Sequence, residues 1–83
     1  MKFIGTVTVA LKEGIFDPQG EAVRSSLVAM GYDGVNKVRM GKDIVLSLEA
    51  SDVAEAEALL DEMSRKLLAS SVTEFYHSKV EEA

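Results

Sequence analysis

Cysteine is absent from this sequence, and histidine occurs only as His77. The lack of thiols excludes disulfides, thiolate metal sites and cysteine nucleophiles together. His77 falls in a predicted strand with no cysteine to join it in a metal site, which favours a surface or interface role. Gly41-Lys42 lacks the earlier glycine and the following helix of a phosphate-binding loop. We therefore expect no metal, no cofactor and no catalytic residue on this chain.

Basic residues and long apolar runs are also scarce. Nine Lys and Arg stand against fourteen Asp and Glu, and the resulting net charge of −5 argues against nucleic acid or anionic membranes as partners. The longest apolar run has four residues, Leu27 to Met30, which is too short to span a bilayer. The N-terminus also lacks the apolar block of a signal peptide, so a cytoplasmic location is expected.

The chain length predicts one small domain, residues 1–83, with a thin core. Its first segment alternates like a strand, and one face carries Phe3, Val7, Val9 and Leu11. Asp17-Pro18 predicts a helix start, because Asp caps free N–H groups and Pro needs no N–H there. Gly31 predicts the end of that helix. Apolar residues follow at spacings of four and three, which places them on one face of this helix: Val23, Leu27 and Met30.

Two β-type segments, residues 35–40 and 44–49, predict a hairpin that turns at Gly41-Lys42-Asp43. Asp52 and Glu55 have the spacing of a capping box, which predicts the start of a second helix. The apolar positions of this helix recur at spacings of three and four: Val53, Ala56, Leu60, Met63 and Leu67. A last strand is expected over about residues 72–80.

This order of elements predicts an α+β fold. It is the ferredoxin-like βαββαβ sandwich, in which a four-stranded antiparallel sheet carries both helices on one face. The other face would stay open, and it would be rather apolar for a surface facing water. We expect that face to carry Ile4, Thr6, Thr8, Val45, Ser47 and Phe75. The chain is therefore expected to form a homodimer or a larger oligomer.

Two short segments are more distinctive. Lys37, Arg39 and Lys42 form a local positive patch, which is either a solvated hairpin tip or a docking patch for an acidic partner or phosphate. In the segment Asp17-Pro18-Gln19-Gly20, helix capping does not explain the glycine. Glycine in a first helical turn costs about 0.5–1 kcal/mol relative to alanine. Gly20 therefore suggests that another backbone segment approaches closely.

Several blocks of the chain are similar to the PurS family. Residues 11–20 carry the pattern Leu-Lys-x-Gly-x-x-Asp-Pro-Gln-Gly, and residues 39–42 carry Arg-x-Gly-Lys. The similarity continues through Met30-Gly31-Tyr32 and residues 66–69, so it extends over most of the chain. The chain thus resembles PurS, the small subunit of phosphoribosylformylglycinamidine synthase.

This resemblance implies a part in a ligase complex of purine biosynthesis. The complex uses ATP and glutamine to convert formylglycinamide ribonucleotide to formylglycinamidine ribonucleotide, with glutamine as the amide donor. A glutaminase subunit, PurQ, releases ammonia, and a synthetase subunit, PurL, uses it with ATP and magnesium. The implied role is a non-catalytic assembly subunit, a dimer that joins PurL to PurQ, assists ammonia transfer and binds no cofactor itself.

Partner binding is expected at six residues: Asp17, Gln19, Gly20, Arg39, Gly41 and Lys42. The alternative is an ACT-like small-molecule sensor, which shares the predicted topology. An acylphosphatase-type enzyme is disfavoured, because the acidic residues 13–17 replace its anion-binding loop. An RNA-recognition module is disfavoured as well, because the central strands lack aromatic residues on which bases stack.

Overall fold

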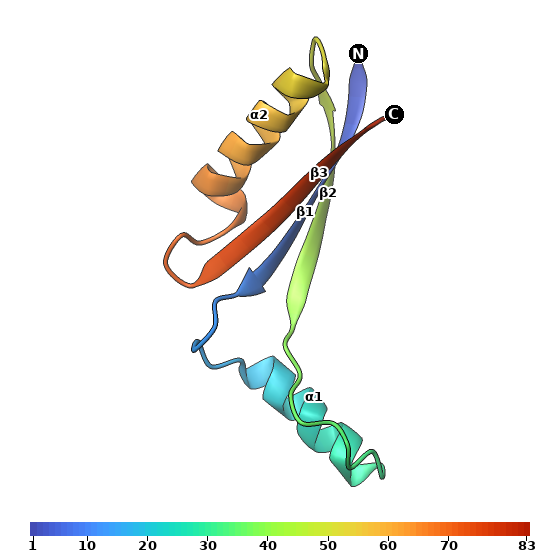
Figure 1. Cartoon of the computed structure of the whole chain (residues 1–83), viewed down its shortest axis with the longest axis vertical. Coiled ribbons are helices and arrows are strands. Elements are labelled where there is room, and N and C mark those ends of the chain that lie inside the picture. The colour runs from blue at the N-terminus through green and yellow to red at the C-terminus, as the bar shows by residue number, and fades with distance from the viewer.

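A computed structural model describes all 83 residues, and a three-stranded antiparallel sheet forms its frame (Figure 1). The strands, in the order in which they lie side by side, are β2 (Gly41–Glu49), β1 (Lys2–Leu11) and β3 (Glu74–Glu82). The helical elements are α1 (Pro18–Ala29), α2 (Val53–Met63) and η1 (Ser64–Leu68), a π-helical segment that continues α2. None of them has the length and apolar character that crossing a membrane requires.

The core lies between α2 and the sheet. β1 alternates as the sequence predicts, and Phe3, Val7 and Val9 on its inner face are buried. Leu60 of α2 is fully buried and fills the space over Gly5, where an added Cβ would lie 2.9 Å from both Leu60 δ carbons. α2 packs mainly on β1 and β3. The inward side chains of β2 are therefore only half-buried, namely Ile44, Leu46 and Leu48.

The prediction of a hairpin at residues 41–43 is wrong. Gly41 and Asp43 belong to β2, where they pair with Ala10 and Thr8 of β1. Residues 35–40 run beyond the end of β1, so they have no neighbouring strand to pair with. For this reason the sheet has three strands rather than the predicted four.

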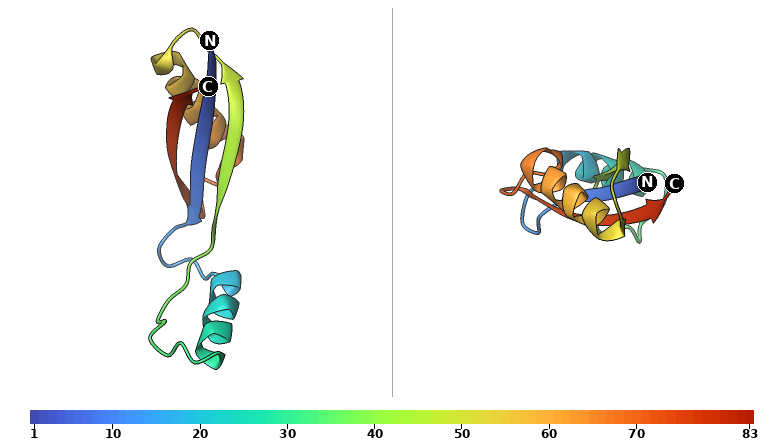
Figure 2. Two further views of the ribbon diagram at one scale, coloured as in Figure 1. Left: turned by 90° about the vertical axis from the view of Figure 1, so that its right-hand side faces the viewer. Right: turned by 90° about the horizontal axis from the view of Figure 1, so that it is seen from above.

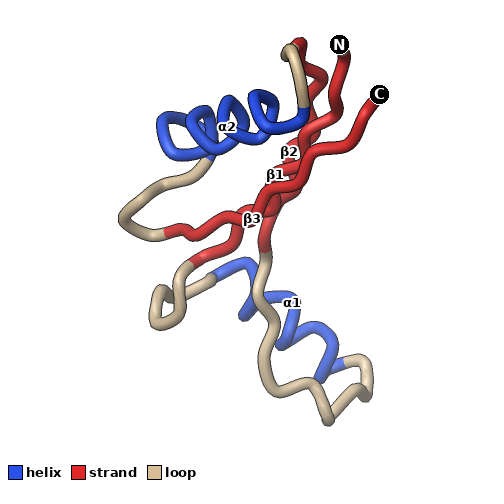
Figure 3. Tube along the Cα trace, turned by 45° about the horizontal axis from the view of Figure 1, so that its top comes forward, coloured by secondary structure: helices blue, strands red, loops and turns tan.

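The prediction that both helices cover one face of the sheet is also wrong. α1 lies beyond the end of the sheet and makes no extensive contact with any strand (Figures 1 and 2). Loop segments before and after α1 join it to the sheet (Figure 3). The molecule is consequently elongated, with extents of 51 × 27 × 14 Å. Its radius of gyration of 16.4 Å exceeds the value of about 12 Å expected for a compact chain of this length.

The boundaries of α1 follow the sequence signals. Asp17 caps its start, and Pro18 is its first residue. Gly31 follows its end with a φ of 102°, a conformation that glycine adopts without strain. Gly31 N–H donates to Val28 O and Tyr32 N–H donates to Leu27 O, which satisfies two of the last carbonyls of the helix.

The sheet face turned away from α2 is uncovered, as the sequence predicts. Ile4, Val45 and Phe75 are 39%, 65% and 55% exposed. Thr8 lies on the same face, where its hydroxyl donates to Asp43 Oδ1 at 2.7 Å. His77 is the β3 neighbour of Thr8 and is exposed, which agrees with the expected surface position.

The second helix begins as predicted and ends differently. Asp52 Oδ1 accepts a hydrogen bond from Glu55 N–H at 2.8 Å, so the expected cap is present. In η1, Ala69 N–H donates to Ser64 O, five residues back, and this wider turn rotates the side chains that follow. Ser64, one turn after Leu60, is fully buried, whereas Leu67 within the wider turn is 83% exposed. The predicted apolar face therefore does not continue to Leu67.

Candidate functional site

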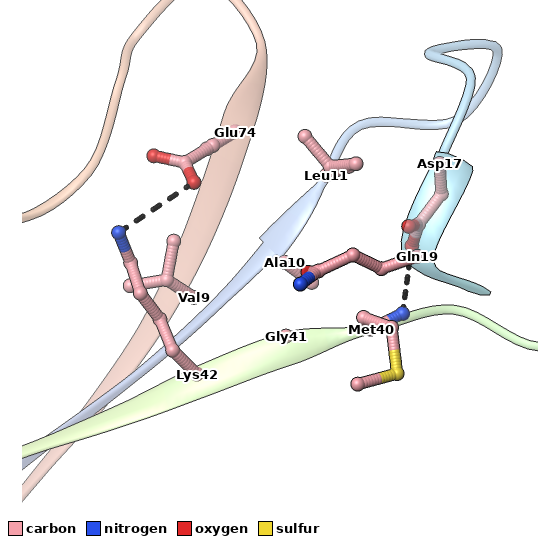
Figure 4. Close-up of a pocket in the computed structure, with 9 residues that line it drawn as sticks. All are labelled: Val9, Ala10, Leu11, Asp17, Gln19, Met40, Gly41, Lys42 and Glu74. Atoms are coloured by element: carbon pink, nitrogen blue, oxygen red, sulfur yellow. Dashed lines mark hydrogen bonds and ion pairs between the residues drawn. The ribbon is translucent and has the colours of Figure 1, made fainter. Parts of the chain in front are cut away.

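The candidate site lies where the end of the sheet meets the start of α1. We call this region the corner and define it as residues 12–20 and 38–42. An open cavity of about 290 Å³ lies between these segments and the ends of β1 and β3 (Figure 4). It is lined by Val9, Ala10, Leu11, Asp17, Gln19, Met40, Gly41, Lys42 and Glu74. The structure thus brings four of the six predicted site residues around one cavity, with Gly20 and Arg39 next to them in the chain.

Asp17 fastens α1 to the beginning of β2. Its side chain is buried, and its two oxygens have different partners. Oδ1 accepts a hydrogen bond from Gly20 N–H at 2.8 Å, which is the helix cap. Oδ2 accepts one from Met40 N–H at 2.7 Å. Helix capping therefore explains only half of what this carboxylate does, and the other half is a link between segments 23 residues apart.

Two glycines allow backbone segments to come close at the corner. A Cβ on Gly20 would lie 2.2 Å from Val38 O, far inside any real contact distance. The close backbone approach expected at this glycine is therefore confirmed. A Cβ on Gly41 would lie 2.7 Å from Val9 O, so this position is also closed to larger residues. Both glycines shape the corner, because no side chain fits at either position.

Arg39 braces the loop before α1. Its Nη1 donates to Ile15 O at 2.8 Å, and its Nη2 donates to Lys12 O at 3.1 Å. These bonds join the segment that follows α1 to the segment that precedes it. The structure therefore gives Arg39 a role inside the chain, and its predicted contact with a partner stays a prediction.

The expected positive patch is divided among separate partners. Lys37 Nζ lies 3.1 Å from Glu13 Oε1, and that ion pair lowers the pKa of the Glu13 carboxyl. Lys42 Nζ lies 3.8 Å from Glu74 Oε2 across the end of β1. Lys42 remains 54% exposed despite this ion pair, and Gln19 is exposed as well. Arg39 is exposed too, but its guanidinium donates to two carbonyls of the chain, whereas the side chains of Gln19 and Lys42 make no hydrogen bond within it.

Glu74 and the loop before it are site elements that the sequence does not reveal. Glu74 reaches Lys42 because β1 pairs with both outer strands, Val9 with Lys42 and Leu11 with Glu74. Lys12 fastens the loop, since its backbone N–H donates to Thr73 O and its Nζ donates to Ser71 O. Residue spacing gives no signal for this arrangement, because it depends on the pairing register of strands far apart in the chain.

The corner keeps the Asp17 carboxyl in its charged form. The hydrogen bond from Gly20 N–H is the main cause that lowers its pKa, followed by the bond from Met40 N–H, and the charge of Arg39 adds to the effect. A pKa lowered in the folded state means that the carboxylate stabilises the fold above the ordinary value of 3.8. That stabilisation is lost as the pH falls through the lowered value.

We expect Asp17→Asn to lower Tm at neutral pH by about 4–10 °C. An amide has one oxygen, so its NH2 group would face an N–H donor at Gly20 or Met40. Asp52→Asn is the matched control, because Asp52 accepts one hydrogen bond, from Glu55 N–H, and an amide oxygen accepts that bond equally well. Its Tm should change by less than about 2 °C.

Circular dichroism melts from neutral to acidic pH measure both effects. The gap between the native chain and Asp17→Asn should narrow below about pH 4, since the native carboxylate then becomes protonated too. Equal losses for the two asparagine variants at neutral pH would contradict the linking role of Asp17.

The cavity suits recognition of another surface better than bond making. The Gln19 amide, the Lys42 ammonium group and the Glu74 carboxylate supply donors and acceptors at its wall. Nowhere in the chain do three or more His, Asp or Glu side chains gather as a metal site would require. The lining therefore offers polar contacts beside the apolar side chains of Val9 and Leu11, which is the composition of a small protein-binding depression.

Comparisons with known proteins point to one family. The family model PurS, described as phosphoribosylformylglycinamidine (FGAM) synthase, matches residues 5–82. The subunit PurS of phosphoribosylformylglycinamidine synthase from Synechocystis is 50% identical over 84% of this chain and 70% of its own length. PurS from Bacillus subtilis superposes with a TM-score of 0.84 at 45% identity, covering 96% of this chain and 99% of its own.

A structure of PurLQS from Thermotoga maritima contains a further similar chain. It superposes with a TM-score of 0.88 at 27% identity and covers 98% of this chain and 99% of its own. The structural matches extend over nearly the whole length of both chains, and the family model covers residues 5–82. The chain belongs to the PurS family of phosphoribosylformylglycinamidine synthase subunits.

Proposed function

We propose that this chain is the assembly subunit that joins the glutaminase PurQ to the synthetase PurL. The observation that carries the proposal is the near full-length similarity to a chain of the Thermotoga maritima PurLQS structure. The family match over residues 5–82 supports treating residues 1–83 as one domain. A cytoplasmic location, expected from the sequence, is part of the same proposal.

The chemistry of the complex explains why an assembly subunit is needed. Ammonia released from glutamine must reach the activated formylglycinamide ribonucleotide as the free base, because its lone pair forms the new carbon–nitrogen bond. In bulk water at neutral pH most ammonia takes up a proton and loses that reactivity. A subunit that holds the glutaminase and the synthetase together shortens the exposed path, and we assign this task to the chain.

ATP and magnesium fit poorly on this chain, and we assign them to PurL. The sequence has no phosphate-binding loop, and its acidic residues do not gather into a metal-binding group. The cavity at the corner is wide open and has Lys42 already opposite Glu74. Its residues serve contact with a protein surface in this proposal, and no step of the ligase reaction is placed there.

Gln19 and Lys42 are the residues proposed to contact a partner subunit directly. Both side chains line the cavity with exposed polar groups, and Lys42 has a carboxylate only at 3.8 Å. Asp17, Gly20, Arg39 and Gly41 would act indirectly, by fixing the backbone that presents these two side chains. The six predicted residues thus divide into two that touch the partner and four that position them.

The ACT-like sensor alternative loses its basis. It rested on a four-stranded sheet with two helices on one face, and the chain has three strands with α1 off the sheet. The family match also points away from it.

We expect reconstitution with PurQ and PurL to reveal the role. The chain alone should show neither glutaminase nor ATPase activity, and its addition to the other two subunits should raise glutamine-dependent product formation. Lys42→Ala and Gln19→Ala should each raise the chain concentration needed for half-maximal activity by about three- to tenfold, since each removes one polar contact. Their Tm should stay within about 3 °C of the native value.

Lys66→Ala is the matched control for Lys42→Ala. Lys66 also pairs with one carboxylate, Glu62 at 2.7 Å, but it lies on η1 rather than at the corner. Its substitution should leave the activity titration unchanged. Turnover by the chain alone would overturn the assembly role, and equal effects of the two lysine substitutions would overturn the assignment of the contact to the corner.

A further inference from the structure

Two exposed apolar side chains stand on neighbouring loops at the corner end of the sheet. Phe16, in the loop before α1, is 72% exposed, and Val72, in the loop before β3, is 77% exposed. Neither side chain packs in the core. Single apolar residues are common on protein surfaces, so exposure alone assigns them no role. These two differ from the common case because the chain holds both loops firmly in place.

Hydrogen bonds fix the backbone on both sides of Phe16. Before it, Ile15 N–H donates to Lys12 O at 3.1 Å, and the Arg39 guanidinium donates to Lys12 O and Ile15 O. After it, the side chain of Asp17 is buried and caps α1. The exposed aromatic ring is therefore carried by a loop that has little freedom to move.

The loop that carries Val72 is a closed turn. Ser70 Oγ accepts hydrogen bonds from Val72 N–H and Thr73 N–H, both at 3.3 Å. Glu74 N–H donates to Ser70 O, and Ser70 N–H donates to Glu74 Oε1 at 2.8 Å. Four bonds thus hold a turn of five residues, and the exposed valine is its middle residue.

Lys12 fastens the two loops to each other. Its backbone N–H donates to Thr73 O at 2.8 Å, and its Nζ donates to Ser71 O at 2.7 Å, so the loops lie side by side at the end of β1 (Figure 1). Phe16 and Val72 therefore stand on one rigid frame. A partner that bound both side chains would not have to order either loop, and ordering is one of the main costs of association.

Lys12 also supplies a charge beside these two side chains. It is exposed and takes part in none of the ion pairs of the chain. Its ammonium group has three donors, and Ser71 O uses one of them. A surface that complements it carries carboxylates. A second copy packed here about a two-fold axis would instead bring one Lys12 against the other.

We propose that Phe16 and Val72, which we call the anchors, insert into an apolar depression of one other subunit of the complex, with carboxylates at its edge opposite Lys12. The inference rests on the proposed function and extends it, because Phe16 belongs to the corner. Interfaces have an apolar centre, in which aromatic residues are enriched, and a polar rim. The anchors supply that centre, and the rim is formed by Lys12, Gln19 and Lys42.

Fluorescence anisotropy of the labelled chain, titrated with PurL, with PurQ and with both, measures this contact. Phe16→Ala should raise the Kd for the subunit that carries the depression at least about tenfold, and Val72→Ala should raise it about three- to tenfold, since aromatic anchors contribute more than valine. Added salt should weaken the native complex, because the contact of Lys12 with carboxylates is screened. The separate titrations identify the subunit.

Two residues of the outer sheet face provide matched controls. Phe75 is 55% exposed and Val45 is 65% exposed, so Phe75→Ala and Val45→Ala remove the same groups from exposed positions away from the two loops. Their Kd values should stay within about twofold of the native value. All four variants should keep Tm within about 3 °C, which separates lost binding from unfolding.

The outcomes distinguish this inference from the proposed function. A native chain that binds neither PurL nor PurQ would overturn both. Native binding that Phe16→Ala and Val72→Ala leave unchanged, or that the two controls weaken equally, would overturn the anchors and leave the assembly role standing. Sedimentation equilibrium of the chain alone should give the same mass for the native protein and the anchor variants. A lower mass for the variants would show that a second copy covers the loops, against the proposal.

Discussion

Gly20→Ala is expected to lower Tm by at least about 10 °C. The added Cβ would lie 2.2 Å from Val38 O and 3.0 Å from Asp17 Cγ and Oδ2. The first of these atoms belongs to the backbone, so it cannot move aside as the end of a flexible side chain can. Relief requires α1 to shift away from the segment before β2, and that shift stretches the bond from Met40 N–H to Asp17. One added methyl group should therefore separate the start of α1 from the segment before β2.

Gly34→Ala is the matched control for this substitution. Gly34 lies in the same connection between α1 and β2, has no positive φ, and an added Cβ there would meet nothing within 4 Å. Its Tm should change by less than about 2 °C. Thermal melts measure both variants, and titration into PurQ and PurL should show lost activity for Gly20→Ala alone. Similar Tm values for the two variants would mean that the close backbone contact does not constrain the fold.

The signals that are local in the sequence predict this structure well. The alternation of β1, the caps at Asp17 and Asp52, and the end of α1 at Gly31 each depend on residues within four positions of one another. Gly20 is an instructive case. The free-energy cost of glycine in a helical turn indicates that another backbone segment lies close to it. The neighbouring residues in the sequence do not show that this segment is the one at Val38.

Features that depend on distant pairing are not predictable in this way. Residues 35–40 have the composition of a strand, but a strand forms only where another strand lies alongside it, and β1 ends before reaching them. The Gly-Lys-Asp triplet at residues 41–43 has the composition of a turn between two strands, but only one of those two strands forms. In the structure Gly41 is needed because Val9 O lies too close for a side chain, so the glycine marks a contact rather than a turn.

The candidate site also contains some features that the local sequence predicts and others that depend on distant contacts. The motif at residues 17–20 and the Arg39–Lys42 segment were identified from sequence, and the fold does bring them together. The bracing bonds of Arg39 and the position of Glu74 opposite Lys42 were not identified. The bonds of Arg39 depend on the path of loop segments more than twenty residues apart in the chain. The position of Glu74 depends on the pairing register of β1 with β2 and β3, so residue spacing predicts neither feature.

The second helix shows how one wider turn alters a regular pattern. Leu60 and Leu67 are seven residues apart, so a continuous α-helix would place both on the buried face. The hydrogen bond from Ala69 N–H to Ser64 O spans five residues instead of four, so the residues within this turn no longer continue the α-helical spacing. Ser64 takes the buried place, where its hydroxyl donates to Leu60 O at 2.8 Å, and Leu67 turns outward. The two leucines therefore have opposite environments.

Leu60→Ala is expected to cost about 2–5 kcal/mol, or about 10–30 °C in Tm, because it removes a fully buried side chain that fills the space over Gly5. Leu67→Ala should change Tm by less than about 3 °C, because that side chain is 83% exposed. The same substitution at two positions of the α2–η1 segment thus distinguishes a helix with the π-helical turn from a continuous α-helix. Denaturant melts of both variants decide between them: a regular helix requires comparable losses at the two positions, whereas the wider turn at Ser64 requires the loss at Leu60 alone.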